Sequence, residues 1–566
     1  MLLFATLCNA TLMSQGNGST ECRCFPGEVC WPSATQWDAF NHTVGGKLIR
    51  NVPLASACRK DGNYDAEACE NLRSTWLYPE THLSSIGSTM APLFTNDSCN
   101  IFAPDDAPCT LGGLVSFAVN ATCTADFQKT VAFVRRHNIR LVVRNTGHDY
   151  NGKSTGAGAL AIWTHYLKTQ EVVDYQSPSY TGKAVKLGAG VEIAESYAFA
   201  QQHGFVNVGG DCPTVGVAGG YTQGGGGHGP GVSKFGLGAD QALEWEVVTG
   251  TGEVLIANRE KNQDLHWALA GGGGGTYGIV SSLTIKVYPD VKSSAASLSF
   301  ASKGNDDDAF WDVVHIWQAS LPSISRSGCF AIWVISPSGF ELVPANCPGL
   351  SKNDTRKLFE PTLKSLEQSN IQYNFTLDEF PNFYDSYKEH NMMFPKNVSQ
   401  SQLGSRLIPK DIVARNNTEL VKIFRHVVSL GNDFLGTAVD VLQHANVTEH
   451  TSVAPHRRQA AFSAIFGTNY DQKNYGVNIA RANEMTDKLL PMLEGITPNG
   501  SAYMNECDFQ QPNFQQVLYG VNYDALLKIE DKYDPDQIFY AITAVGSERW
   551  YSNEEQGGRL CPVSTV

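Results

Sequence analysis

The sequence lacks two features that define large classes of proteins. None of its apolar runs reaches the ~20 residues of a membrane-spanning helix. Positive charge is scarce, since 42 Lys and Arg residues face 56 Asp and Glu residues and leave a formal net charge of −14. Nucleic acids and anionic membrane surfaces are bound by clusters of basic side chains. We therefore expect no nucleic-acid partner and no membrane partner.

Charged residues of both signs are also few, at 17% of the chain, whereas hydrophobic residues make up 42%. This composition is typical of a folded globular protein rather than of a disordered chain. A chain of 566 residues is too long for one compact core, so two or more domains are expected. We expect a monomer that acts on small molecules.

The first residues lack the basic stretch that opens a secretory signal peptide. Residues 1–12 are apolar but few, so they form at most a weak or truncated signal. Eleven Asn-x-Ser/Thr sequons nevertheless favour a secreted glycoprotein. They begin at Asn9, Asn17, Asn41, Asn96, Asn120, Asn353, Asn374, Asn397, Asn416, Asn446 and Asn499.

The fourteen cysteines lack the spacing of a zinc site. The gaps between Cys22, Cys24 and Cys30 match no usual set of zinc ligands, so we expect no metal. With Cys8 in the possible leader and Cys212 set aside for a role described below, twelve cysteines remain, an even number. We expect these to form disulfides in an oxidising compartment.

Two glycine-rich turns carry the side chains with the most distinctive chemistry. Each follows a strand-like run, and glycine lets the backbone pass close to a flat or charged ligand. The first turn offers the imidazole of His148 and the second the thiol of Cys212. Held against one electrophilic ring, both side chains could bond to it covalently. The two segments are Arg144-Asn145-Thr146-Gly147-His148-Asp149-Tyr150 and Gly209-Gly210-Asp211-Cys212-Pro213-Thr214-Val215-Gly216.

Hydrophobic periodicity places these turns in an alternation of strands and helices. The density of glycine falls after about residue 289, which indicates a second domain. Strands are expected at 139–144, 184–187 and 279–288, a hairpin at 243–256, and helices at 124–138, 191–203, 265–270 and 523–534.

Residues 147–154 fit the phosphate-binding pattern G-x-x-x-x-G-K-[ST]. Such a loop needs a helix that begins at the Lys-Ser pair, because helix N–H groups hold the phosphates. Gly156 and Gly158 follow instead, and they make a poor first helical turn. A P-loop nucleotide-binding protein is therefore kept only as an alternative from another functional class.

Residues 273–278 satisfy the G-x-G-x-x-G pattern of dinucleotide-binding folds. That motif must open a helix, whereas the β-rich, alternating residues 279–287 follow here. The glycines instead suit a close approach of the backbone to a cofactor.

Both reactive turns resemble the flavin-attachment sequences of the berberine bridge enzyme-like oxidases, a branch of the vanillyl-alcohol-oxidase flavoproteins. The Cys212 turn matches fully, whereas Asn145-Thr146-Gly147 replaces the usual Ser-Gly-Gly before the His. The resemblance runs from about residue 99 to the C-terminus and includes the glycine stretch 267–280. Residues 519–523 and 532–539 match as well, while 22–32 and 544–548 resemble the isoamyl alcohol oxidase-like branch found in fungi.

The resemblance implies an α+β fold, with a PCMH-type FAD-binding domain and a substrate domain whose antiparallel sheet is covered by helices. Residues 1–98 would form a Cys-rich segment packed on the FAD domain. Residues 99–290 would form the FAD-binding domain and residues 291–498 the substrate-binding domain. Residues 499–566 would return to the FAD domain.

The resemblance also implies covalent FAD, with His148 bonded to the flavin 8α-methyl carbon and Cys212 to ring carbon C6. Other residues of the matching segments would contact the cofactor without a covalent bond. They are Arg144, Asn145, Thr146, Gly147, Asp149, Tyr150, Gly209, Gly210, Val215, Gly216, Gly219, Gly220, Gly274, Gly275, Gly278, Ile279, Asn522 and Tyr523.

The residues expected in catalysis follow from the cofactor. Flavin N5 accepts a hydride, so the protein must supply orientation and a base. In relatives the base is a Tyr of an Asn-Tyr-x-Asp segment, and Glu506 stands at that position here. We expect Glu506 to be the base, with a surface carboxylate as the alternative and Tyr503 as a second candidate. His456 could face the substrate pocket or lie in a solvated loop.

The family also implies that O2 takes up the electrons of the reduced flavin. The position three residues after the linked Cys acts as the oxygen gate, and Val215 there leaves room for O2. The expected protein is thus a secreted FAD-dependent oxidase that oxidises an alcohol or related small organic substrate and releases H2O2. A carbohydrate oxidase, a secondary-metabolite tailoring oxidase and a non-catalytic flavin-binding glycoprotein remain alternatives.

Overall fold

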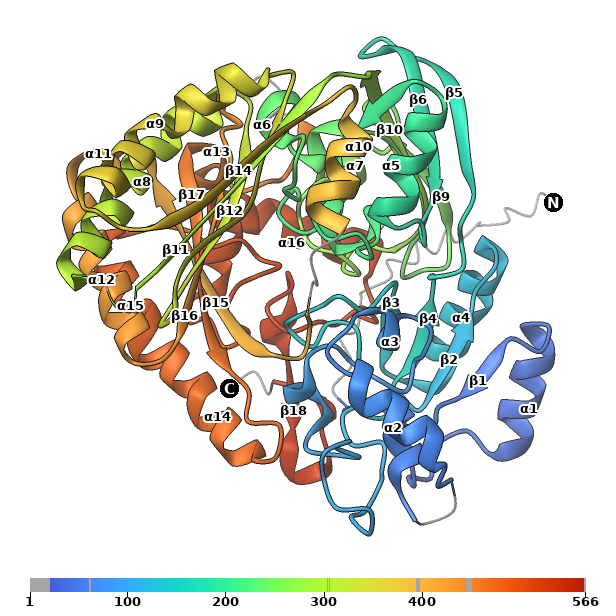
Figure 1. Cartoon of the computed structure of the whole chain (residues 1–566). Helices are drawn as coiled ribbons and strands as arrows, with labels where there is room; N and C mark the ends of the chain where they lie inside the picture. Colours follow the sequence, from blue (N-terminus) through green and yellow to red (C-terminus); the bar gives the residue numbers. More distant parts are fainter. Residues whose placement is uncertain are drawn as a thin grey trace, which may run out of the picture.

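The computed structural model describes residues 21–60, 63–302, 304, 306–392, 397–443 and 450–563. Its strands form a four-stranded, a six-stranded, a seven-stranded and a two-stranded sheet, with helices packed against them (Figure 1). This mixture of helices with largely antiparallel sheets is the expected α+β class.

The four-stranded sheet holds the turn that carries His148. Its order is β1-β2-β4-β3, and β2, β4 and β3 run parallel. Helix α4 packs here through Phe127, Val131 and Val134, and it ends at Asn138, whose φ of 48° suits a left-handed helix cap. The bounds are β1 Leu48–Arg50, β2 Phe117–Asn120, β3 Leu141–Arg144, β4 Leu160–Trp163 and α4 Thr124–His137.

Residues near the end of the chain pack on this same sheet. Phe539 pairs with Leu141 in an isolated parallel bridge. Ile538 and Phe539 are buried in the core cluster that α4 and β3 share. The expected tail helix is present as α16, Tyr523–Tyr533. The C-terminal segment therefore contacts the first half of the chain.

The six-stranded sheet leads into the turn that carries Cys212, which follows β7. Its order is β5-β6-β10-β8-β9, with β7 paired to β10, and neighbouring strands are antiparallel. The expected hairpin is β8–β9, and the strand after the glycine run is β10. The bounds are β5 Gln170–Gln176, β6 Thr181–Gly188, β7 Phe205–Asn207, β8 Ala242–Val248, β9 Val254–Asn258, β10 Ile279–Pro289, α5 Ile193–Gln202, α6 Val232–Phe235 and α7 Gln263–Leu269.

The seven-stranded sheet is antiparallel throughout and has the order β14-β11-β13-β12-β16-β17-β15. Helices α8, α9, α12 and α15 cover one of its faces (Figure 1). On that face the ring centroids of Trp317 and Trp333 lie 5.6 Å apart. Because side chains alternate along a strand, the neighbours Ile332 and Val334 project from the other face.

The elements of this part of the chain follow the expected pattern of helices on an antiparallel sheet. The bounds are β11 Ser293–Ala301, β12 Phe330–Ser336, β13 Gly339–Pro348, β14 Tyr373–Phe380, β15 Ser401–Pro409, β16 Asp433–Ala438, β17 Ala460–Asn469, α8 Asp307–Arg326, α9 Lys352–Gln368, α10 Phe383–Tyr387, α11 Lys410–Arg415, α12 Asn417–Ser429, α13 His456–Gln459, α14 Tyr475–Glu484 and α15 Leu490–Ile496.

The Cys-rich beginning is held by disulfides, as expected, but not every cysteine pairs. Cys123 is exposed and free, and Cys507 is buried and free, so the even number of cysteines did not predict complete pairing. The disulfides are Cys22–Cys561, Cys24–Cys30, Cys58–Cys69, Cys99–Cys109 and Cys329–Cys347. The nearby elements are α1 Ala34–Thr43, α2 Ala66–Thr75, α3 Glu80–Leu83, β18 Trp550–Asn553 and β19 Arg559–Pro562.

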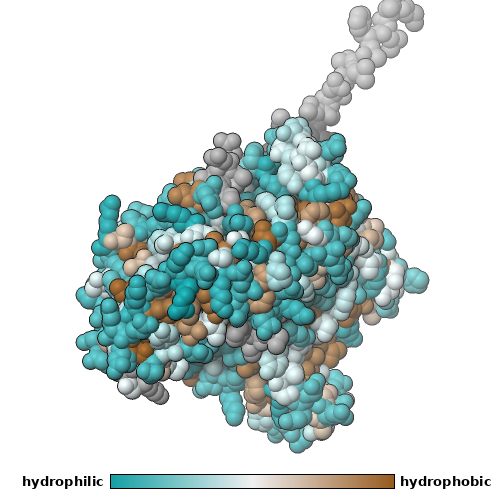
Figure 2. All heavy atoms as spheres, turned by 45° about the horizontal axis from the view of Figure 1, so that its top comes forward, coloured by the Kyte–Doolittle hydropathy of each residue, from teal (hydrophilic) through white to brown (hydrophobic). Residues whose placement is uncertain are grey.

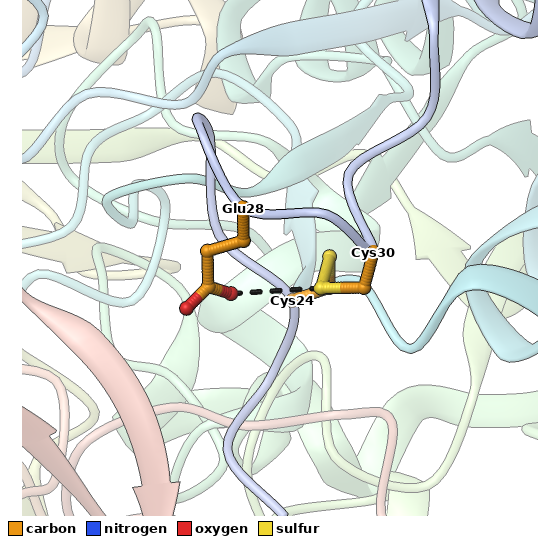
Figure 3. A group of neighbouring side chains, drawn as sticks. All are labelled: Cys24, Glu28 and Cys30. Carbon is orange, nitrogen blue, oxygen red and sulfur yellow. Dashed lines mark hydrogen bonds between the residues drawn. A yellow bond between two sulfur atoms is a disulfide. The ribbon is translucent and has the colours of Figure 1, made fainter.

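A metal-like grouping in this segment is explained by one of the disulfides. Cys24, Glu28 and Cys30 bring their ligand atoms together, but the two sulfur atoms are bonded to each other (Figure 3). The Glu28 carboxylate accepts a hydrogen bond from the backbone N–H of Phe25 at 2.9 Å and pairs with Arg559 at 2.6 Å. These contacts occupy the groups that a metal ion would need.

The face drawn in Figure 2 is mostly hydrophilic, with hydrophobic residues scattered over it. Among the described residues, none of the helices combines the length and apolar character needed to cross a bilayer. The sequon asparagines at 96, 353, 374, 397 and 499 are exposed. The expected weak signal at residues 1–12 and the sequons at 9, 17 and 446 lie outside the described residues.

Candidate active site

A cavity of about 680 Å³ opens between the two reactive turns and the uncovered face of the seven-stranded sheet. His148 and Cys212 line it together with the glycine tracts at 216–220 and 274–278. Strands β12, β13 and β16 form the opposite wall. The cavity thus combines nucleophilic side chains, bare backbone and an apolar surface.

His148 and Cys212 are neighbours in space although 64 residues separate them. The Nε2 atom of His148 lies 4.0 Å from the Sγ atom of Cys212 and 2.6 Å from Oγ1 of Thr214. Gly147 has a φ of +83°, and a Cβ atom there would lie 2.9 Å from the Arg144 guanidinium. A larger residue at 147 would therefore displace the turn that presents His148.

Burial sets the charge state of the imidazole. It lowers the pKa of His148 to about 3, with a smaller contribution from the charge of His82. The ring is therefore neutral at ordinary pH and keeps a lone pair for bond formation. Burial, together with Cys212 and Glu506, raises the pKa of Tyr150, which keeps that phenol neutral as well.

The glycine tracts provide a floor without side chains. A Cβ atom built on Gly274 would meet the Cα atom of Gly220 at 3.5 Å, so the two backbones face each other across a narrow space. Oδ1 of Asn145 and Oε1 of Gln223 belong to cavity-lining residues, are buried, and have no hydrogen-bond partner among the described residues. A flat group with N–H and O–H donors, such as a flavin with its ribityl chain, fits these acceptors.

Most of the residues expected to contact the cofactor line this cavity. They are Asn145, Thr146, Gly147, His148, Asp149, Tyr150, Gly210, Cys212, Val215, Gly216, Gly219, Gly220, Gly274, Gly275 and Gly278. Both candidate bases, Glu506 and Tyr503, line it too.

Arg144 lies elsewhere. Its guanidinium donates to the backbone carbonyls of Ser88, His82 and Ser85 at 2.7, 3.2 and 2.9 Å. The side chain is 1% exposed and does not line the cavity. In the described structure it anchors the N-terminal segment to the end of β3 instead of contacting the cofactor space.

Four further residues of the expected set do not line the cavity: Gly209, Ile279, Asn522 and Tyr523. The Tyr523 hydroxyl donates to the Glu548 carboxylate at 2.6 Å, and Nδ2 of Asn522 donates to the Ser452 carbonyl at 3.1 Å. These contacts hold the tail in place, outside the lining of the cavity.

The P-loop alternative fails on geometry. The first helix or strand after residues 147–154 is β4, so no helix begins at Lys153 and Ser154 in this described stretch. The Asp149 carboxylate accepts hydrogen bonds from the backbone N–H groups of Asn151 and Ser154 at 2.9 and 3.1 Å. These two backbone N–H groups are therefore already bonded within the loop and are not available to a phosphate.

Glu506 belongs to a group of polar side chains in close contact at the cavity. Its Oε1 atom lies 3.1 Å from Nε2 of His228, and Nδ1 of His228 accepts from Arg457 at 2.7 Å. The Arg457 guanidinium stacks over the Tyr503 ring, 4.4 Å from its centroid. Burial raises the pKa of Tyr503 above its usual value, and Nδ2 of Asn505 donates to its hydroxyl at 2.8 Å. Tyr503 is thereby a weaker candidate base than Glu506.

A buried ion pair positions Arg457. The next residue, Arg458, donates to both carboxylate oxygens of Asp240 at 2.6 and 3.0 Å, and both side chains are 3% exposed. Arg458 also donates to Thr451 at 3.2 Å. His456, the residue suggested by the sequence, is half-buried and does not line the cavity.

The opposite wall is built from three adjacent strands. Ile332 and Val334 of β12 pair with Thr437 and Leu435 of β16, and Val334 also pairs with Glu341 of β13. All of them line the cavity, as does Val343. The partly exposed aliphatic side chains there would gain free energy by covering an apolar ligand.

Sequence reasoning missed His228, Arg457 and this wall. His228 lies in the glycine tract 224–231, where a single imidazole among glycines was the available signal. Arg457, whose side chain reaches the site, directly follows His456, the residue that the sequence suggested. The wall has no local signal, because it depends on which strands pair.

Comparisons with known proteins indicate an FAD-binding protein, in agreement with the fit of a flavin to the cavity. A family model described as an FAD binding domain matches residues 107–258, and one described as berberine and berberine like matches residues 502–546. The chain is 42% identical over 566 residues to the FAD-linked oxidoreductase sor8 of Hypocrea jecorina, with 99% of this chain and 96% of that protein covered.

Two solved structures extend the comparison. The VAO-type flavoprotein MtVAO615 from Myceliophthora thermophila C1 has a TM-score of 0.91 and 37% identity, covering 96% of this chain and 100% of its own. Berberine bridge enzyme from Eschscholzia californica has a TM-score of 0.65 and 15% identity, covering 90% of this chain and 98% of its own, a likeness of fold alone.

Proposed function

The chain belongs to the berberine bridge enzyme-like, VAO-type FAD-linked oxidoreductases, and on that premise we propose that it is a secreted oxidase with flavin attached at both His148 and Cys212. It converts a small organic alcohol to the carbonyl compound while O2 becomes H2O2. The alcohol loses a hydride from carbon and a proton from oxygen, and O2 takes up both in the end to form H2O2.

The observation that carries the double attachment is the 4.0 Å between Nε2 of His148 and Sγ of Cys212, beside a glycine floor. The imidazole is neutral because burial lowers its pKa to about 3. An imidazole lone pair and a thiol at one end of a flat space are the nucleophiles that two bonds to one ring require.

The reaction assigns separate tasks to the groups around the cavity. Bound FAD supplies the hydride acceptor. Glu506 takes the proton of the substrate hydroxyl, since its carboxylate lines the cavity. The aliphatic wall of β12, β13 and β16 holds the substrate body and excludes water. Val215 lines the cavity three residues after Cys212 and leaves the space through which O2 approaches.

The same wall favours an alcohol over the carbohydrate alternative. Sugars are recognised by many hydrogen-bonding groups, whereas four of the six wall residues, Ile332, Val334, Val343 and Leu435, offer none and leave Thr437 and Glu341 as its polar members. Secretion is supported by the disulfides and by exposed sequons such as Asn353 and Asn374. We retain the expectation of a monomer, which the mass of the purified protein in solution would check.

The decisive experiment begins with acid precipitation of the purified protein. Yellow colour should stay with the protein, and mass spectrometry should find one flavin joining the peptides that contain His148 and Cys212. His148→Ala should keep flavin through Cys212, and the double variant with Cys212→Ala should lose it. Unmodified Cys212 in fully flavin-loaded protein contradicts the double attachment.

A second measurement separates an oxidase from a flavin-binding protein without activity. Primary alcohols, aromatic alcohols and sugars are each offered, and H2O2 is recorded. Peroxide with an alcohol supports the proposal. Flavin that is reduced by an alcohol but reoxidised no faster than free flavin shows a dehydrogenase instead.

A further inference from the structure

The side chains behind Glu506 form a chain of close polar contacts from Arg457 through His228. We propose that His228 and Arg457 are positioning residues, and that His228 acts on Glu506 as a fixed hydrogen-bond donor and not as a proton shuttle. This inference rests on the proposed role of Glu506 as the base. It assigns a task to two buried residues that the reaction itself does not use.

The direction of the chain follows from the donor–acceptor inventory of each group. A guanidinium can only donate, so Nδ1 of His228, 2.7 Å from Nη2 of Arg457, must accept. A ring proton is then carried on Nε2. That atom lies 3.1 Å from Oε1 of Glu506 and is the donor there in the proposed arrangement, because a carboxylate oxygen accepts.

Arg457 also occupies the other nitrogen of the ring. Its guanidinium donates to Nδ1 at 2.7 Å, and Arg457 and His228 are 3% and 8% exposed, so water does not compete for this contact. The ring therefore acts on Glu506 through Nε2 while Arg457 holds Nδ1.

Two phenols among the described residues also face Glu506. They are Tyr150 and Tyr503, and burial raises the pKa of both, which keeps them neutral. Cys507 follows Glu506 in the chain, but burial raises the pKa of its thiol too. The contact with His228 is thus what orients Oε1 of Glu506.

Glutamine separates positioning from proton shuttling. In His228→Gln the side-chain oxygen can accept from Arg457 and the nitrogen can donate to Glu506, yet the group does not titrate. A fixed donor is thereby kept and a shuttle is removed. His228→Ala removes both. His456→Gln and His456→Ala on the neighbouring α13 are matched controls, since His456 does not line the cavity.

The test uses flavin-loaded enzyme and measures the anaerobic rate of flavin reduction by an alcohol across pH 4–9. We expect the rate of flavin reduction in His228→Gln to stay within about 3-fold of wild type, with the low-pH limb of its rate–pH profile, the acid limb, unchanged. His228→Ala should lose about 10-fold, and its acid limb should move up by about 1 pH unit, the size of one lost hydrogen bond to a charged acceptor. Arg457→Lys should keep more of the rate than Arg457→Met.

Two results would overturn the inference. If His228→Gln is as slow as His228→Ala, the ring shuttles protons. If His228→Ala keeps the wild-type limb while Glu506→Gln abolishes reduction, Glu506 is the base but His228 does not position it. Unchanged reduction in Glu506→Gln would instead refute the proposed function. Thermal unfolding and covalent flavin content of every variant identify any that misfold, and the His228→Gln comparison then decides.

Discussion

Replacing Arg458 with Met should destabilise the protein strongly. The substitution keeps most of the side-chain volume but removes the cation that faces Asp240. Both partners are 3% exposed, and two hydrogen bonds of 2.6 and 3.0 Å join them. The carboxylate left behind would be buried with the backbone N–H of Leu237, 2.9 Å away, as its remaining hydrogen-bond partner among the described residues.

The magnitude follows from that burial. Removing one partner of a buried ion pair costs about 3–5 kcal/mol, because the other charge stays buried without compensation. At about 2–4 °C per kcal/mol for a domain of this size, the melting temperature should fall by ~6–20 °C. Replacing both partners, in Arg458→Met with Asp240→Leu, should recover much of the loss because no charge is then stranded.

The assay is thermal unfolding of all four proteins of this double-mutant cycle, followed by circular dichroism. Arg425→Met is the matched control, since Arg425 is 42% exposed and pairs with Asp308 at 2.6 Å on the surface. That variant should lose less than about 1 kcal/mol. If Arg458→Met costs no more than Arg425→Met, or if the double variant is additive, the buried pair does not hold α13 and Arg457 in place.

Two further predictions concern oxygen and acid. Val215→Leu should slow reoxidation of the flavin by O2 far more than its reduction by substrate, and equal slowing of the two stopped-flow half-reactions would mean that Val215 is not the gate. Burial holds the pKa of His82 and His266 at about 4 and 3, so the stabilisation from their neutral forms is complete above pH 6.5 and is lost as the pH falls through that value toward 3. Asp534, whose pKa burial raises to about 7, acts in the opposite sense, so the prediction compares a variant with the wild type. His82→Gln should flatten the fall in the free energy of unfolding between pH 6.5 and 4 by up to ~1.4 kcal/mol per pH unit, and an identical slope in the two proteins would contradict the pKa assigned to His82.

The parts of the site that could be predicted from the sequence are those encoded within a few neighbouring residues. Gly147 and His148 are adjacent, and the positive φ that the turn needs is available to glycine. The glycines before β10 and the alternation within that strand are equally local. These segments were placed correctly because short-range sterics decide them.

The parts that could not be predicted depend on contacts between distant segments. His228 and Arg457 meet across 229 positions, and no pattern in either segment encodes the distance between Nδ1 and the guanidinium. Arg144 shows the converse. It belongs to a matching motif, yet its guanidinium donates hydrogen bonds to three backbone carbonyls of the N-terminal segment. A motif specifies where the backbone goes, whereas the direction of a long side chain depends on what else packs nearby.

The disulfide between Cys22 and Cys561 closes a covalent ring around a sequence separation of 539. Arg23 reinforces the closure, since its guanidinium lies over the Trp550 ring at 4.4 Å and donates to Oδ1 of Asn138 at 2.7 Å. A protease that cuts one exposed loop inside this ring would leave a single covalent molecule, and fragments would separate only after reduction. The same closure makes the chain suited to circular permutation, with new ends opened in a surface loop.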